Sequence, residues 1–288
     1  MRREVRLTAG WLVAVGLLVA VLVLAKEDVQ KVDVEGRKLR VQIEGQAREG
    51  QPAVVFVSGL GEGVEAWRLV QPQVAQLTRT VSYDRAGLGQ SEPDEARPTH
   101  QHAMAQLRTL LQNAGIKPPY VLVGHSIGGP LIRVFAGLYP SEVAGLVFVD
   151  PTDFTQTRAD QLAIWTTLGS GEAGLEAFDK TVWGQFAEAH PAVRAEAEVA
   201  EQLTKGGWED YRSLAPLPDI PVVILMGAKY DLPPEMLRVM GKQRMEHLAK
   251  LAVEVPNGAL VVTNRSGHGI HHSEPELVTW AVKRTLGL

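Results

Sequence analysis

The stretch Gly124-His125-Ser126-Ile127-Gly128-Gly129 decides the fold, because it joins an apolar run to a helical pattern. The run before it, Tyr120-Val123, predicts a buried strand, and Ile127-Tyr139 predicts a helix. A serine between two glycines at a strand-to-helix junction fits the pattern G-x-S-x-G. The turn strains the serine backbone, and only small residues at positions 124 and 128 avoid a collision there.

This turn indicates that Ser126 is a nucleophile. Its hydroxyl is exposed at the carboxyl edge of the sheet, and the free N–H of Ile127 points to where an oxyanion would form. We expect the second oxyanion donor to be the N–H of Leu60, in the loop Ser58-Gly59-Leu60-Gly61 that follows an apolar run. An ordinary glycine-rich turn is the alternative for that loop. It lacks the lysine and the glycine spacing of nucleotide-binding loops.

A serine hydroxyl needs a base to take its proton, and His268 is the best placed of the eight histidines. It lies between two glycines, just after the last predicted strand. His271 and His272 lie close by, and we expect them to be packed in a loop or exposed. His125 is expected to pack inside the turn. Four further histidines have no supporting motif: His100, His102, His190 and His247.

The base in turn needs an acid that fixes its tautomer and stabilises the imidazolium. We expect Asp231, which follows the strand Val222-Met226 and completes the chain order Ser, Asp, His. The alternative is Asp150, at the end of the preceding strand, with Asp153 nearby. Asp84 is expected to hold its own loop by hydrogen bonds.

Strand and helix patterns alternate along the rest of the chain, and Glu65 to Leu77 is expected to be one of the helices. This order predicts an α/β fold, a doubly wound and mostly parallel sheet with helices on both faces. From about residue 152 to 217 the pattern is helical without a convincing strand, which predicts a cap that forms the substrate pocket. Aromatic residues gather there: Phe154, Trp165, Phe178, Trp183, Phe186 and Trp208.

The composition excludes several classes of protein and site. The net charge of -4 and the lack of a basic stripe give no reason to expect nucleic-acid binding. The chain has no cysteine, so disulfides, cysteine nucleophiles and thiolate metal sites are excluded. His271 and His272 are adjacent instead of four residues apart, and no metal or other cofactor is expected.

Residues 1–28 are expected to form a membrane anchor or a signal peptide. Arginines near the start precede Leu7 to Ala25, which carries no charge. A membrane span needs about 17–25 residues and a signal peptide has an apolar region of about 7–15, so the length favours an anchor. Val23-Leu24-Ala25 resembles a cleavage site, which leaves the signal peptide open. Either element places residues 29–288 outside the cytoplasm. An anchor would leave them attached to the membrane, and a cleaved signal peptide would leave them secreted or periplasmic.

Taken together, the chain resembles the α/β-hydrolase superfamily, in particular its esterase-like members with a helical cap between the sixth and seventh strands. The resemblance covers essentially everything after the apolar segment. The matching pieces, in family order, are Ser58-Gly59-Leu60-Gly61, Tyr83 to Ser91, Val123 to Gly129, Val149-Asp150-Pro151, Gly227 to Asp231, and Ser266-Gly267-His268.

The resemblance implies a serine hydrolase that cleaves a small-molecule ester or related acyl bond through Ser126, His268 and Asp231. A serine at position 126, instead of an aspartate, argues against the dehalogenase and epoxide-hydrolase branches. Two departures are Ser58-Gly59 in place of His-Gly, and an acid four residues after Gly227 instead of three. The fold does not fix the reaction, so C–C bond hydrolysis, acyl transfer to another acceptor and a non-catalytic, membrane-tethered binding protein remain alternatives.

Overall fold

The computed structural model describes residues 28–288. The expected anchor or signal peptide, residues 1–28, lies outside the described residues except for its last position. Within residues 28–288, no helix combines the length and the apolar character needed to cross a membrane.

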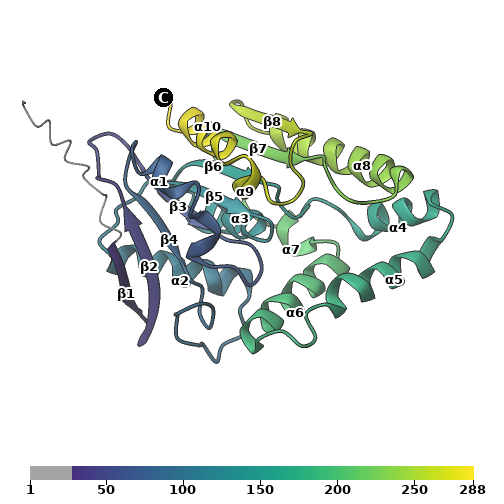
Figure 1. The fold of residues 1–288 in the computed structure, drawn as a ribbon, viewed down its shortest axis with the longest axis horizontal. Helices are drawn as coiled ribbons and strands as arrows, with labels where there is room; N and C mark the ends of the chain where they lie inside the picture. The colour runs from purple at the N-terminus through teal and green to yellow at the C-terminus, as the bar shows by residue number, and fades with distance from the viewer. Residues whose placement is uncertain (1–27) are drawn as a thin grey trace, which may run out of the picture.

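The described residues contain one eight-stranded sheet. Its strands are β1 (Asp28–Val34), β2 (Arg37–Glu44), β3 (Ala53–Val57), β4 (Thr80–Tyr83), β5 (Tyr120–His125), β6 (Val143–Val149), β7 (Val222–Gly227) and β8 (Gly258–Thr263). They lie in the order β1-β2-β4-β3-β5-β6-β7-β8, shown in Figure 1. β2 pairs antiparallel with β1 and β4, and every other pair is parallel. The predicted doubly wound, mostly parallel sheet is confirmed, and the carboxyl ends of β3 to β8 share one edge.

Helices cover both faces of the sheet because alternate residues of its central strands point to opposite sides. In β3, Val55 and Val57 pack on one face, while Val54 and Phe56 pack on the other. The first face carries α2 (His100–Asn113), α3 (Gly128–Leu138) and α8 (Pro234–Val253); the second carries the 3₁₀ helix η1 (Val64–Trp67), α1 (Gln71–Val74), α9 (Ile270–Ser273) and α10 (Pro275–Thr285). A short 3₁₀ turn, η2 (Pro140–Glu142), precedes β6.

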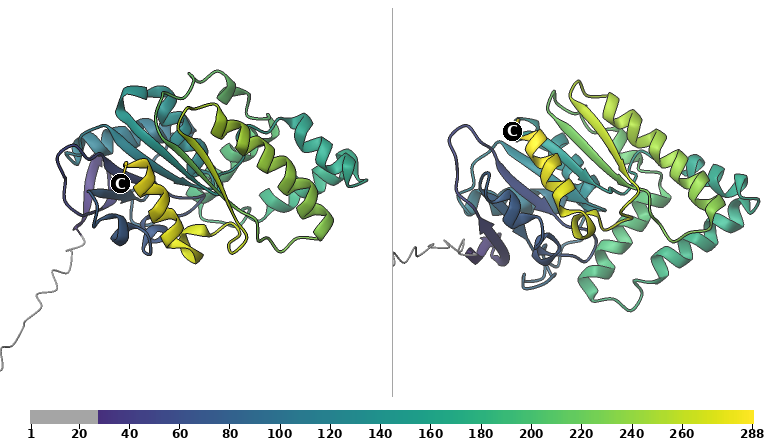
Figure 2. Two further views of the ribbon diagram at one scale, coloured as in Figure 1. Left: turned by 90° about the horizontal axis from the view of Figure 1, so that it is seen from above. Right: turned by 45° about the horizontal axis from the view of Figure 1, so that its top comes forward.

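The segment expected to form the cap is helical. It contains α4 (Arg158–Thr167), α5 (Gly171–Gly184), α6 (Pro191–Lys205) and α7 (Glu209–Arg212), between β6 and β7. We call these four helices the cap. They lie, with α8, on the side of the molecule away from β1 and β2 (Figures 1 and 2). The start of α4 is fixed by a capping box, in which Thr157 and Asp160 satisfy each other's backbone N–H.

The single helix expected at Glu65 to Leu77 is wrong, because this segment forms η1 and then α1. Pro72 explains the break. Proline has no backbone N–H and its ring collides with the preceding turn, so it is tolerated only where a helix begins. Here Pro72 lies in the first turn of α1.

Candidate active site

Ser126 lies at the sharp turn between β5 and α3, as the sequence predicts. Its φ of 53° is in the left-handed region, which costs a residue with a side chain on the order of 1–3 kcal/mol. The flanking glycines are required by close contacts. A Cβ at Gly124 would lie 2.3 Å from the carbonyl oxygen of Gly128, and a Cβ at Gly128 would lie 2.2 Å from that of Val57. The turn therefore has no room for a side chain at position 124 or 128.

Backbone hydrogen bonds fix this turn against the end of β6. The N–H of Ser126 donates to the carbonyl of Val149 over 3.2 Å, and its own carbonyl accepts from Thr152 over 3.0 Å. Asp150 lies between these two partners in the chain. The candidate nucleophile and the end of β6 are thus held together by main-chain contacts.

His268 reaches the same edge from the loop after β8. Two glycines allow this loop to pass close to its neighbours: a Cβ at Gly227 would lie 2.2 Å from the carbonyl oxygen of Gly267. His125 Nε2 donates to the carbonyl of His268 over 3.0 Å, which ties the loop to the residue before Ser126. Within residues 28–288 no hydrogen bond joins Ser126 Oγ to the His268 ring. Such catalytic hydrogen bonds are often long before substrate binds.

The acid that contacts His268 is Asp150, and the expectation of Asp231 needs correction. Asp150 Oδ2 accepts a 2.7 Å hydrogen bond from His268 Nδ1, whereas Asp231 is exposed to solvent. The loop after β7 explains the difference. Its backbone is pinned to Ser266 by the N–H groups of residues 228 and 229. This course turns Tyr230 inward, toward Asp150, and leaves Asp231 outside.

Asp150 is fully buried and has four donors around it. Besides His268, its carboxylate accepts from the N–H of Gly227 over 2.8 Å, from Arg244 Nη1 over 3.0 Å and from the Tyr230 hydroxyl. Burial alone would raise the pKa of Asp150, but the hydrogen bond from His268, the charge of Arg244 and the Tyr230 hydroxyl together lower it. The carboxylate is therefore ionised and fixed in place.

Tyr230 and Arg244 were not predicted as site residues. Arg244 lies in the middle of α8 and reaches both Asp150 and the carbonyl of Pro151, the latter over 2.9 Å. Nothing in its local sequence distinguishes it from the other charged residues of that helix. Tyr230 directly precedes Asp231, so the loop expected to supply the acid supplies instead a hydroxyl donor to Asp150.

The two expected oxyanion donors are free in the described part of the chain. The backbone N–H groups of Leu60 and Ile127 have no acceptor among residues 28–288. The loop carrying Leu60 is held by its own contacts: the N–H of Gly59 donates to Glu62 Oε2 over 3.0 Å, and Ser58 Oγ to the carbonyl of Gly63 over 2.9 Å. Both N–H groups are thus available to stabilise a developing negative charge.

A group of histidines lies behind the site. His125 packs inside the turn as expected, with Nδ1 3.1 Å from Glu62 Oε2, and its ring centroid is 4.1 Å from that of His271. His271 is fully buried, neither ring nitrogen has a partner among the described residues, and burial lowers its pKa to about 2. Donor atoms of Glu62, His271 and His272 lie within 4.8 Å of one another. Although no ligand cluster was expected around the adjacent histidines, these three residues could hold a metal ion.

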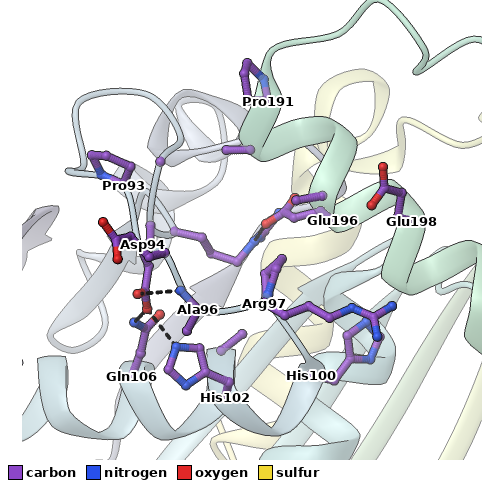
Figure 3. Close-up of a pocket in the computed structure, with 18 of the residues that line it drawn as sticks. Pro93, Asp94, Ala96, Arg97, His100, His102, Gln106, Pro191, Glu196 and Glu198 are labelled. Carbon is purple, nitrogen blue, oxygen red and sulfur yellow. Dashed lines mark hydrogen bonds and ion pairs between the residues drawn. The ribbon is translucent and has the colours of Figure 1, made fainter.

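Two cavities border the site. One of about 420 Å³ is lined by Ile127 and by apolar and polar residues of α2, α6 and the loop before α2, including the Asp94–His102 pair seen in Figure 3. The other, of about 610 Å³, has Asp150 and His268 at its wall. Its remaining lining is largely apolar, from the cap, α8 and the last two strands: Ile164, Phe178, Met226, Leu232, Leu237, Met240, Met245 and Val262. Trp165 and Trp183, expected in the substrate pocket, do not line it.

Comparisons with known proteins agree with this architecture. An "AB hydrolase superfamily protein" of Gibberella zeae is 24% identical, covering 83% of this chain and 87% of that protein. A (lyso)-N-acylphosphatidylethanolamine lipase of Bos taurus is 30% identical over 42% of this chain and 36% of its own. The solved structure of a thermophilic esterase from Thermogutta terrifontis superposes with a TM-score of 0.58 at 20% identity, covering 89% of this chain and 97% of that one.

The family model described as "Alpha/beta hydrolase family" matches residues 54–279, which is well over half of the chain. That range begins in β3, includes the serine turn, the cap and the histidine loop, and ends within α10. The chain therefore belongs to the alpha/beta hydrolase family.

Proposed function

We propose that this protein is a serine hydrolase that cleaves carboxylic esters or closely related acyl bonds through Ser126, His268 and Asp150. The observation that carries the proposal is a strained serine at the same sheet edge as an exposed histidine that is hydrogen-bonded to a buried carboxylate: Ser126 has a φ of 53°, and His268 Nδ1 lies 2.7 Å from Asp150. The lipase and esterase named among the relatives support a hydrolytic reaction.

In the proposed mechanism Ser126 Oγ attacks the carbonyl carbon of the substrate while His268 Nε2 takes its proton. Nε2 is suited to this step because Nδ1 already donates to Asp150, which fixes the tautomer. The N–H groups of Leu60 and Ile127 stabilise the oxyanion. His268 then protonates the leaving alcohol, and water activated by the same histidine releases the acyl group from Ser126.

The apolar cavity beside His268 suits the acyl chain of the substrate. Its lining is mostly aliphatic and methionine side chains, and its volume of about 610 Å³ exceeds that of a short acyl group. The cavity beside Ile127 has a mixed lining of apolar and charged side chains, the latter including Arg85, Asp94 and Glu196.

The test is hydrolysis of p-nitrophenyl esters of graded acyl length by the purified wild-type protein and by Ser126→Ala. We expect wild-type hydrolysis, and a loss of at least about 10³-fold in kcat for the variant, because a triad nucleophile has no substitute. Folded wild-type protein that is inert toward every ester would contradict the proposal and favour C–C hydrolysis, acyl transfer or a binding role.

A further inference from the structure

The oxyanion loop, residues 58–62, contacts the cap as well as the sheet. Its Gly61 N–H donates to Glu196 Oε2 on α6 over 3.1 Å. Gly61 has a φ of 71°, and a Cβ there would lie 3.0 Å from Val193 Cγ1, also on α6. One face of this cap helix therefore packs directly on the loop that carries the candidate oxyanion donor Leu60.

Arg85 holds the same loop from the other side. Its Nη1 donates to the carbonyl of Ser58 over 2.8 Å, and its Nη2 to the carbonyl of Gly59 over 2.6 Å. The carbonyl of Gly59 and the N–H of Leu60 belong to one trans peptide unit and point in opposite directions. By fixing the carbonyl of Gly59, Arg85 also fixes the direction of the Leu60 N–H.

Glu196 fixes Arg85 in turn. Its carboxylate accepts from both Nε and Nη2 of Arg85, the second over 2.9 Å, in the two-pronged geometry that orients a guanidinium most strictly. The side chains of Arg85 and Glu196 are only 6% and 13% exposed, so solvent screens the pair weakly. Burial alone would lower the pKa of Arg85, but the charge of Glu196 outweighs it and raises that pKa, which keeps the guanidinium charged.

We propose that Glu196 and Arg85 are positioning residues, which couple the docking of cap helix α6 to the direction of the Leu60 N–H. Glu196 acts on the loop in two ways: it accepts a hydrogen bond from the N–H of Gly61, and it orients the Arg85 guanidinium that holds the carbonyl of Gly59. The site then stabilises an oxyanion fully only when the cap is docked. This inference rests on the proposed function for its catalytic consequence, though not for its structural one.

The test compares the full-length Glu196→Gln variant with wild type by hydrogen exchange of the peptide that spans residues 58–62, and by ester kinetics. Glutamine offers one acceptor oxygen where Glu196 offers two, and its NH₂ would face a donor of Arg85 or Gly61. We expect faster exchange in the loop. Since the oxyanion donor is misdirected and not removed, we expect kcat to fall about 10-fold or more while KM changes little.

The matched control is Glu201→Gln on the same helix, which removes an ion pair with Lys205 that lies away from the loop. It should leave loop exchange and kcat at wild-type values. Arg85→Lys keeps the charge but cannot hold two carbonyls, so it should reproduce the kcat defect. If Glu196→Gln does not fold, Val193→Ala replaces it, because it loosens the contact of α6 with Gly61 without leaving a buried charge unpaired.

Two results would overturn the coupling: wild-type exchange in residues 58–62 of the folded variant, or faster exchange there without any fall in kcat. Exchange needs no turnover, so it tests the structural coupling even if wild-type protein hydrolyses no ester. In that case faster loop exchange would leave the coupling standing while the proposed function fails. If wild-type protein hydrolyses esters but exchange of residues 58–62 is unchanged in the variant, the coupling is contradicted and the proposed function is not.

Discussion

At the scale of single residues, Ser126 and Asp150 share an unusual backbone conformation at neighbouring strand ends. Their φ values are 53° and 44°, in the left-handed region that residues with side chains rarely adopt. Each such residue costs on the order of 1–3 kcal/mol, and the cost is retained where the surrounding structure holds it for a function. Both residues lie at the shared carboxyl edge of the sheet.

The identity of the acid is testable at this scale. We expect Asp150→Asn to lower kcat for ester hydrolysis by about 10⁴-fold, because an amide at that position no longer fixes the tautomer of His268 or stabilises its charged form. Asp231→Asn should change kcat by less than about 2-fold, since an exposed side chain away from the histidine contributes little. Steady-state kinetics of both variants decide the point. A large loss for Asp231→Asn with near-normal activity for Asp150→Asn would reverse the assignment.

The sequence located these residues unequally. Ser126 and His268 could be proposed from the sequence because their glycine-flanked motifs are local and adjoin predictable strands. The choice of acid could not be made there, because the order Ser, Asp, His is satisfied equally by Asp231 and by the alternative, Asp150. The choice depends on how the loop after β7 is pinned to Ser266, a contact between distant segments that no local pattern encodes.

At the scale of elements, strands were predicted well because their apolar runs are long and buried. The two faces of β3 and the whole of β5 and β7 are inaccessible to solvent. Helix boundaries were less accurate: periodicity alone suggested one helix where Pro72 forces two. The cap was predicted as helical, but not which of its side chains line a cavity, because that depends on how α4 and α5 face α8.

Phe178 on α5 tests the role of the cap. Phe178 is one of the aromatic residues expected in the substrate pocket, and it lines the apolar cavity beside His268. Phe178→Ala should enlarge that cavity and shift the preference toward longer acyl chains, by about 10-fold in relative kcat/KM, since even one methylene contributes about 1–3 kcal/mol to discrimination. Trp183→Ala is the control, because Trp183 lies outside that lining. The cavity does not hold the acyl chain if both variants keep the wild-type ester profile.

At the scale of the whole molecule, the sheet is the rigid framework, and the candidate site residues lie at the ends of its strands and in the loops that follow. Six parallel strands end at one edge, so residues from β5, β6 and the loop after β8 meet there although up to 143 positions separate contacting pairs such as His125 and His268. Arg244 reaches the same edge from α8, and Glu196 reaches its oxyanion loop from the cap. The proposed activity therefore depends on the assembled edge and not on any one motif.

The most direct test of the central claim is covalent trapping with a fluorophosphonate, followed by mass spectrometry of the peptides. The reagent reacts with a serine only where a base activates it and an oxyanion hole receives the phosphonyl oxygen. We expect a single adduct on Ser126 in wild-type protein, formed far more slowly in Asp150→Asn and at the wild-type rate in Asp231→Asn. An adduct on another residue, or folded protein that forms none, would contradict it.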